Sequence, residues 1–233
     1  MPFSTPGCSR QPANTYTQLQ CYLRHIASKE LSMSEIKLTY FNTRGRAEVT
    51  RLIFTQAQRK FVDNRIDREE WAKMKDSTPK GQLPVLEVDG MMICESAAIA
   101  RFAARETGLY GSNNKEAAIC DMVTDSIGEV AHAAINKMFS AKTEDEKNAA
   151  DEKIYESLKP LEKLVAQYKK GTYVLGDKVA APDISLYSMV AFCTDANPEF
   201  KTDSIPTIAG IAKSFSEQPH IAAYLASRPK TEH

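Results

Sequence analysis

Tyr40 closes a short alternating run and lies six residues before Arg46, within the segment Tyr-Phe-Asn-Thr-Arg-Gly-Arg. A helix is expected to start here, so its free N–H groups and the guanidinium would place positive charge near the phenol. A tyrosine hydroxyl in such surroundings can donate a hydrogen bond to an anion. Taken alone, the pattern also fits a tyrosine that only packs within a sheet.

Pro84 interrupts a second apolar run, Leu-Pro-Val-Leu-Glu-Val, at residues 83–88. Proline cannot donate to a sheet and is confined to edges and bulges. A cis bond after Leu83 would turn the Leu83 backbone outward. Its N–H and C=O could then pair with a peptide-like ligand as a strand does. An edge strand with a trans proline is the alternative, and the pattern leaves both open.

Two further pairs could each hold a carboxylate. Glu95-Ser96 precedes a helical pattern, with Ser96 as the expected N-cap, and the N–H groups at a helix start attract anions. Trp71 and Lys75 are four residues apart, so on a helix they would share a face and offer an indole N–H and an ammonium. As isolated pairs, both are more often a plain cap and a packed tryptophan beside a solvated lysine.

The elements that must position these residues follow from periodicity and turn signals. Alternation predicts strands, apolar spacing predicts amphipathic helices, and Asp89-Gly90 is typical of a tight hairpin turn. Gly108 is expected to end the last helix of this segment. The order predicts an α/β unit: strand, helix, strand, helix, strand, strand and helix at residues 36–41, 47–57, 61–66, 68–75, 83–88, 91–94 and 96–106.

The second half has no strand-like runs. Residues 113–170 are charged and amphipathic and predict two helices that are separated near 142–144. Pro160 lies inside the second of them and should kink or limit it. Further helices are expected at 183–195, 205–215 and 219–226. The chain therefore divides into an α/β unit at 34–111 and an all-helical unit at 113–233.

Residues 1–33 are expected to form an N-terminal extension, disordered or partly helical. Several prolines and a glycine break its start, and a weakly basic amphipathic stretch follows. Such a stretch is compatible with a transit peptide. A leader that precedes a true start at Met33 is the interpretation that we favour.

Composition excludes several classes of function. The 30 basic and 30 acidic residues cancel, so no basic excess indicates nucleic acid or an anionic membrane as a partner. No apolar run is long enough to span a bilayer. The cysteines are scattered without a Cys-x-x-Cys pair, which favours free thiols in the cytoplasm over a zinc site or a dithiol centre: they are Cys8, Cys21, Cys94, Cys120 and Cys193.

The signals gain weight because they occur together and in one order. Five segments carry a close resemblance to sigma-class glutathione transferases, and it extends over residues 34–230. The first begins Lys-Leu-Thr-Tyr-Phe-Asn-Thr-Arg-Gly-Arg, the third contains Gly-Gln-Leu-Pro-Val-Leu, and the last is Gly-Asp-Lys-Val-Ala-Ala-Pro-Asp. The segments are residues 37–54, 70–75, 81–90, 95–102 and 176–183.

The resemblance implies a thioredoxin-like N-terminal domain, an all-α C-terminal domain, a homodimer and glutathione as cosubstrate. Tyr40 matches the catalytic tyrosine that holds the glutathione thiol as a thiolate. Trp71 and Lys75 would bind the glycyl carboxylate, Leu83 the cysteinyl backbone, and Ser96 the γ-glutamyl carboxylate. The positions matched to glutathione contacts are Tyr40, Phe41, Arg46, Trp71, Lys75, Gln82, Leu83, Pro84, Glu95, Ser96 and, across the dimer interface, Glu129.

Three departures from the family pattern stand out. Many sigma-class members have Gln where this chain has Glu95, although a carboxylate can accept from the γ-glutamyl ammonium equally well. Ala180 replaces the usual Ser or Thr cap, at a cost of about 1 kcal/mol of stability. The acidic cluster that binds metal in the vertebrate prostaglandin D synthase corresponds here to Asp125, Gly128 and Glu129. We therefore expect no metal site.

The expected activity is conjugation of glutathione to hydrophobic electrophiles. Their site would lie between the domains, lined by Phe41, Thr43 and Gly45 and by helix residues around 127–131 and 186–192. A glutathione-dependent prostaglandin D isomerase is the second enzymatic alternative, and an S-crystallin or ligand carrier is the non-enzymatic one. A disulfide oxidoreductase is disfavoured, because no cysteine lies between Tyr40 and Arg46.

Overall fold

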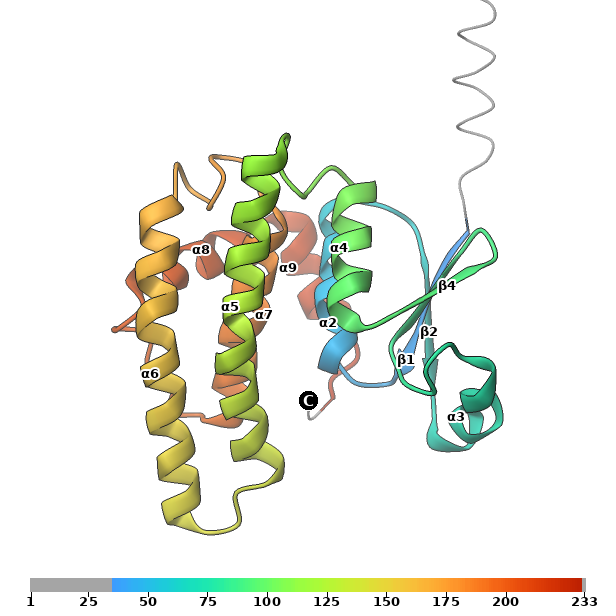
Figure 1. The fold of residues 1–233 in the computed structure, drawn as a ribbon, viewed down its shortest axis with the longest axis horizontal. Coiled ribbons are helices and arrows are strands. Elements are labelled where there is room, and N and C mark those ends of the chain that lie inside the picture. Colours follow the sequence, from blue (N-terminus) through green and yellow to red (C-terminus); the bar gives the residue numbers. More distant parts are fainter. Residues whose placement is uncertain (1–34, 232–233) are drawn as a thin grey trace, which may run out of the picture. The chain divides into compact units, whose positions relative to one another are not determined.

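The computed structural model describes residues 35–231, so the prediction for residues 1–33 lies outside the described part. Residues 36–231 belong to one compact unit. The elements, labelled in Figure 1 where there is room, are β1 (Ile36–Phe41), the 3-10 turn η1 (Gly45–Ala47), α2 (Glu48–Gln56), β2 (Val62–Ile66), α3 (Arg68–Met74), the 3-10 turn η2 (Lys75–Ser77), β3 (Val85–Val88), β4 (Met91–Cys94), α4 (Ser96–Glu106), α5 (Asn114–Phe139), α6 (Glu144–Tyr168), α7 (Ala181–Ala196), α8 (Pro206–Ser216) and α9 (Pro219–Ser227).

The strands of the described chain form one mixed sheet in the order β2-β1-β3-β4. β1 pairs in parallel with β2 and antiparallel with β3, and β3 and β4 form the predicted hairpin. Tyr40 lies opposite Arg65 in the β1–β2 register. The predicted α/β first half with a thioredoxin-like sheet is confirmed.

Helices α2 and α4 lie between the sheet and the later helices in Figure 1. Their apolar sides are buried together with the sheet, as the 3.6-residue spacing requires. The core continues without a break into the helical half. Its fully buried members in the first half include Leu38, Leu52, Ile53, Phe54, Leu86 and Ile99.

The predicted all-helical second half is also confirmed. The long helices α5 and α6 run side by side (Figure 1). Pro160 does not limit α6, which continues to Tyr168. Burial of Leu158, Leu161 and Val165 on both sides of the proline accounts for this, because packing outweighs the lost hydrogen bond. Among the described helices, none is long and apolar enough to cross a membrane.

Helix α7 starts at Ala181, two residues earlier than expected, so Asp183 is its third residue. Ala180 is the N-cap and provides no side-chain cap. The Asp183 carboxylate instead accepts hydrogen bonds from the N–H groups of Ala180 at 2.8 Å and Val174 at 2.9 Å. Half of a capping box is thus retained. The domain boundary at 111–113 falls between α4 and α5 and stays a prediction.

Candidate active site around Tyr40

Tyr40 is the penultimate residue of β1, and the loop that follows folds back over its ring. The backbone N–H of Arg46 donates to Tyr40 Oη at 3.3 Å. The phenol oxygen therefore already accepts one hydrogen bond from the protein. Its own proton is left to donate to a ligand.

Gly45 makes this close approach possible. Its φ is +41°, and a Cβ at this position would lie 2.7 Å from Tyr40 Oη and 2.8 Å from Cε1. No real Cβ atom tolerates such distances, and L-residues rarely adopt this backbone conformation. The loop can therefore rest against the Tyr40 ring only with glycine at position 45.

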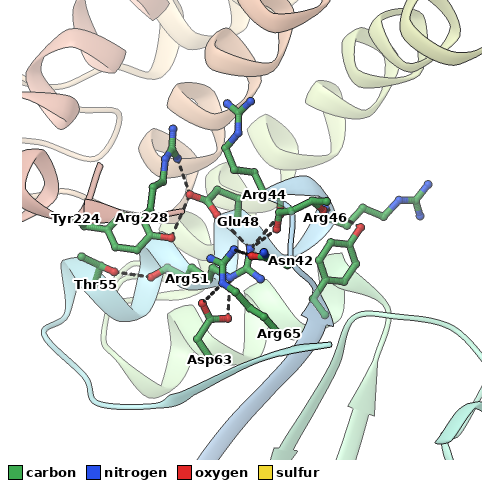
Figure 2. A network of polar contacts seen from close by, with 12 residues as sticks. Asn42, Arg44, Arg46, Glu48, Arg51, Thr55, Asp63, Arg65, Tyr224 and Arg228 are labelled. Atoms are coloured by element: carbon green, nitrogen blue, oxygen red, sulfur yellow. Dashed lines mark hydrogen bonds and ion pairs between the residues drawn. The ribbon is translucent and has the colours of Figure 1, made fainter. Parts of the chain in front are cut away.

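Arg51 of α2 holds the same loop from below (Figure 2). Its side chain has no exposed surface. Its Nη1 donates to the carbonyl oxygens of Thr43 at 2.8 Å and Arg44 at 3.2 Å, and its Nε donates to Asp63 of β2 at 2.9 Å. The centre of the guanidinium lies 6.0 Å from the centroid of the Tyr40 ring.

Glu48 completes this network and extends it to the second half of the chain. Its carboxylate lies 3.3 Å from Arg51 Nη1 and also accepts from Tyr224 Oη at 3.1 Å and Arg228 Nη1 at 2.6 Å. Tyr224 belongs to α9, and Arg228 follows that helix directly. Burial, followed by the charge of Glu48, raises the pKa of the Tyr224 hydroxyl, so this residue remains a neutral donor.

The start of α4 differs from the prediction in one respect. Glu95, not Ser96, is the N-cap, because its carbonyl accepts the first helical hydrogen bond from Ile99 at 2.9 Å. Glu95 has a φ of +68°, and its side chain does not cap the helix. The N–H groups of the first turn, including that of Ser96, thus have no side-chain cap and can receive an anion.

Glu95 itself forms an ion pair with Lys80, a residue that the sequence did not single out. The hydrogen bond from Lys80 and then its charge hold the pKa of the Glu95 carboxyl below its usual range. The charge of Arg46 acts in the same direction, which brings the Tyr40 loop and the start of α4 into one electrostatic neighbourhood.

The bond between Leu83 and Pro84 is cis, as one of the two alternatives predicted. The expected strand at 83–88 begins only at Val85, so Pro84 lies before β3 and not inside it. This resolves the conflict that the sequence posed, because no sheet hydrogen bond is required of the proline nitrogen. The Leu83 backbone lies outside the paired residues of β3.

A second line of contacts leads from Tyr40 towards α3. The rings of Tyr40 and Phe41 are 5.8 Å apart, and the Phe41 ring meets Trp71 edge-on at 6.4 Å. Lys75, one turn after Trp71, extends over Gly81, where a Cβ would lie 3.5 Å from Lys75 Cε. Gln82 follows at once and is exposed. Contacts thus connect Tyr40 through Phe41 to Trp71, and the backbone N–H of Lys75 donates to the Trp71 carbonyl.

Comparison with known proteins identifies the family of the chain. Residues 36–105 match the family model of the glutathione S-transferase N-terminal domain, and residues 129–228 match that of the glutathione S-transferase C-terminal domain. Glutathione S-transferase 1 of Ascaris suum is 36% identical over 208 residues, which cover 85% of this chain and 99% of the relative. The chain belongs to the glutathione transferase family.

Two other matches concern the sigma-class resemblance. The hematopoietic prostaglandin D synthase of Gallus gallus is 34% identical to this transferase, over 85% of this chain and 99% of its own. The solved sigma-class transferase of Fasciola hepatica has a TM-score of 0.74 at 28% identity and covers 86% of this chain and 99% of that one. The resemblance drawn from the sequence is confirmed.

The remaining acidic residues that the sequence singled out belong to α5. Glu129 is exposed on α5. Asp125, one helical turn earlier, pairs with Arg101 of α4, which also binds Asp121 at 2.6 Å. Within residues 35–231, no group of three or more His, Cys, Asp or Glu side chains is placed to hold a metal ion.

The expected electrophile site between the two halves stays a prediction. Phe41 and Thr43 line a hollow of about 730 Å³ with Arg65, Ile66 and residues of the β2–α3 turn. This lining comes from the first half of the transferase. The contribution expected from residues 127–131 and 186–192 stays a prediction, as do the individual glutathione contacts.

Proposed function

We propose that this transferase binds glutathione beside Tyr40 and transfers its sulfur to hydrophobic electrophiles. The observation that carries the proposal is the state of the Tyr40 hydroxyl. Its oxygen is held by the Arg46 N–H, and its proton is available at the end of β1. A donor fixed in this way stabilises a thiolate, because it is already oriented before the charge appears.

The tripeptide can be placed on groups of matching chemistry. The uncapped N–H groups at Ser96 would take the γ-glutamyl carboxylate, and the Glu95 carboxylate its ammonium. The Leu83 backbone would pair with the cysteinyl residue as a strand does. Trp71 and Lys75 would hold the glycyl carboxylate, while Phe41, Arg46 and Gln82 border the peptide between these ends.

The required stabilisation is modest. A cysteine thiol has an ordinary pKa of about 8.5, so little thiolate exists at neutral pH. Lowering that pKa by about 2 units takes roughly 2.7 kcal/mol. One hydrogen bond from Tyr40 to a charged acceptor, together with the positive end of a helix, reaches this magnitude.

Chemistry follows in one displacement step. The thiolate attacks an electrophilic carbon, a carbon–sulfur bond forms, and the leaving group departs with its electron pair. Tyr40 holds the sulfur as an anion until the attack and touches no other reacting atom. Phe41 and Thr43 would offer the apolar electrophile its first contacts.

Tyr40→Phe tests the proposal, because it removes one hydroxyl and keeps the ring. We expect the Kd for glutathione, measured by isothermal titration calorimetry, to stay within about threefold. The kcat/KM with chlorodinitrobenzene should fall by about 100-fold, the equivalent of roughly 2.7 kcal/mol. Turnover close to that of the unaltered protein would refute the role of Tyr40.

Glutathione-dependent isomerisation to prostaglandin D is a second candidate, favoured by the match to the hematopoietic prostaglandin D synthase. Product analysis with the endoperoxide substrate decides between the two activities. S-crystallins are also among the relatives. The presence of Tyr40, Arg46, Trp71 and Lys75 supports an enzyme, because a purely structural protein would not need all four.

We also propose a cytoplasmic homodimer in which Glu129 reaches towards the partner's glutathione. The resemblance to sigma-class enzymes and the exposed position of Glu129 on α5 support this. One solved relative, from Necator americanus, is described as monomeric. Analytical ultracentrifugation therefore provides the direct test, and a monomer at micromolar concentration would contradict the proposal.

A further inference from the structure

We propose that Arg51 is a positioning residue for Tyr40, and that Glu48 and Arg228 hold Arg51 in place. The inference rests on the proposed function, because it concerns the hydroxyl that would hold the glutathione sulfur. Arg51 does not touch the ligand site itself. It acts through the loop whose Arg46 N–H donates to Tyr40 Oη, and Figure 2 shows Arg51 beside the loop residues Asn42 and Arg44.

The contacts of Arg51 are placed where they fix that loop. Its Nη1 binds the carbonyl oxygens of Thr43 and Arg44, which directly precede Gly45 and Arg46. The N–H of Arg46 is the group that donates to Tyr40 Oη. Only Gly45 thus separates the anchored Arg44 carbonyl from the Arg46 N–H that orients the phenol.

Burying the charge of Arg51 costs desolvation free energy, so a buried arginine needs a reason other than stability. Arg51 is fully buried, and its Nη2 has no hydrogen-bond partner within the described residues. A buried ion network with an unsatisfied group is weak evidence for stability, since apolar residues often serve better. Arginine can, however, bind a carboxylate and two carbonyls from one planar group, which lysine cannot do. The network therefore favours a role in positioning.

Glu48 connects Arg51 with α9 and the residue that follows it. One of its oxygens faces Arg51, and the other accepts from Arg228 and Tyr224, which lie 180 and 176 residues later. Arg44 of the loop makes a parallel link to Asp195 of α7 at 2.8 Å. Loss of Arg228 would leave Glu48 held only by Tyr224 and Arg51, and would loosen Arg51 without any change near the ligand.

A misplaced loop has a specific consequence. If the Arg46 N–H moves away from Tyr40 Oη, the hydroxyl is no longer fixed and stabilises the thiolate less well. The pH at which kcat/KM is half-maximal would then rise, since it reports the ionisation of the glutathione thiol. Binding of the peptide ends at Trp71, Lys75 and Ser96 would persist.

The experiment measures the pH profile of kcat/KM with chlorodinitrobenzene for Arg51→Lys, Arg51→Met and Arg228→Met, each compared with the unaltered protein below its unfolding temperature. We expect the midpoint to rise by about one pH unit in the Arg51 variants, which is about a tenfold loss of kcat/KM below the midpoint. Arg228→Met should shift it in the same direction by less. The glutathione Kd should change less than about threefold in all three.

Lys137→Met is the matched control. Lys137 pairs with Asp151 between α5 and α6, and both side chains are largely buried, at 12% and 22% exposed. Its loss should lower the melting temperature without moving the pH midpoint. A merely structural role for Arg51 predicts the same behaviour for the Arg51 variants.

The outcomes separate this inference from the proposed function. An unchanged midpoint in Arg51→Lys and Arg228→Met, with Tyr40→Phe inactive, overturns the positioning role alone. Full activity of Tyr40→Phe overturns the proposed function. If Arg51→Met fails to fold, the pH midpoints of Arg51→Lys and Arg228→Met still test the positioning role. Arg51→Lys keeps the buried positive charge, and the Arg228 side chain is partly exposed, so both variants are expected to fold.

Discussion

Replacing Gly45 with alanine probes the contact between the loop and Tyr40 directly. The added Cβ would lie 2.7 Å from Tyr40 Oη, whereas ordinary contact starts at 3.4 Å, so the loop or the ring must move by about 0.7 Å. A left-handed conformation adds about 1–2 kcal/mol for an L-residue. Both effects act on the one hydroxyl that the proposed chemistry uses.

The expected result is a large loss of rate with a modest loss of stability. Displacements approaching 1 Å in a catalytic group can cost about 100-fold, so we expect kcat/KM with chlorodinitrobenzene to fall by about 10- to 100-fold. The free energy of unfolding in urea should fall by about 1–2 kcal/mol. Steady-state kinetics and urea titration on the same preparation give both quantities.

Gly90→Ala is the matched control for Gly45→Ala. Gly90 also has a positive φ, +78°, but a Cβ there would meet no atom within 4 Å. It should lose similar stability and keep full activity. If Gly45→Ala retains the kcat/KM of the unaltered protein, or if Gly90→Ala loses as much, the contact with Tyr40 does not control the chemistry.

Two further predictions concern ionisable groups. Burial raises the pKa of the Asp183 carboxyl from 3.8 to about 6, so between these values the folded state keeps a proton that the unfolded state has released. The stability contributed by this group is therefore present below pH 3.8 and lost as the pH rises through 6. In urea titrations, the difference in unfolding free energy between the unaltered protein and Asp183→Asn should therefore shrink by about 3 kcal/mol across that pH range. Lys80→Met removes an exposed partner of Glu95, so we expect no measurable change in stability and glutathione binding tighter by about twofold, because the Glu95 carboxylate is released to accept from the γ-glutamyl ammonium. Weaker binding in calorimetry would show that Lys80 itself helps to hold the peptide.

The elements that could be predicted are those fixed by local pattern. Residues 36–41 and 96–106 alternate or repeat with the period of their structure, and both elements begin and end where the pattern does. The conformation at Pro84 could be predicted as one of two alternatives, a cis bond or an edge strand with a trans proline, because a proline nitrogen cannot donate a hydrogen bond inside a sheet. Choosing the cis form required the backbone around it.

The residues that escaped prediction are those whose role depends on distant partners. Arg51 looks like one more polar residue of an amphipathic helix, but it pairs with Asp63 on β2 and with Glu48, which is itself held by the distant Arg228. Ser96 has the better capping propensity, yet the positive φ of Glu95 makes that residue the cap. Helix boundaries near Pro160 and Asp183 shifted for the same reason: packing and a buried carboxylate outweighed the local signal.

The shared carboxylate of Glu48 also bears on how the protein reaches an active state during synthesis. A nascent chain that has just completed α4 already contains Tyr40, Trp71, Leu83 and Ser96. It still lacks Arg228, so the loop that lies against Tyr40 has only half of its anchor. If Arg228 acts through Glu48 as proposed, the loop takes its final position only once α9 has docked. An unfinished chain would then hold the glutathione thiol in a less acidic form than the complete protein does.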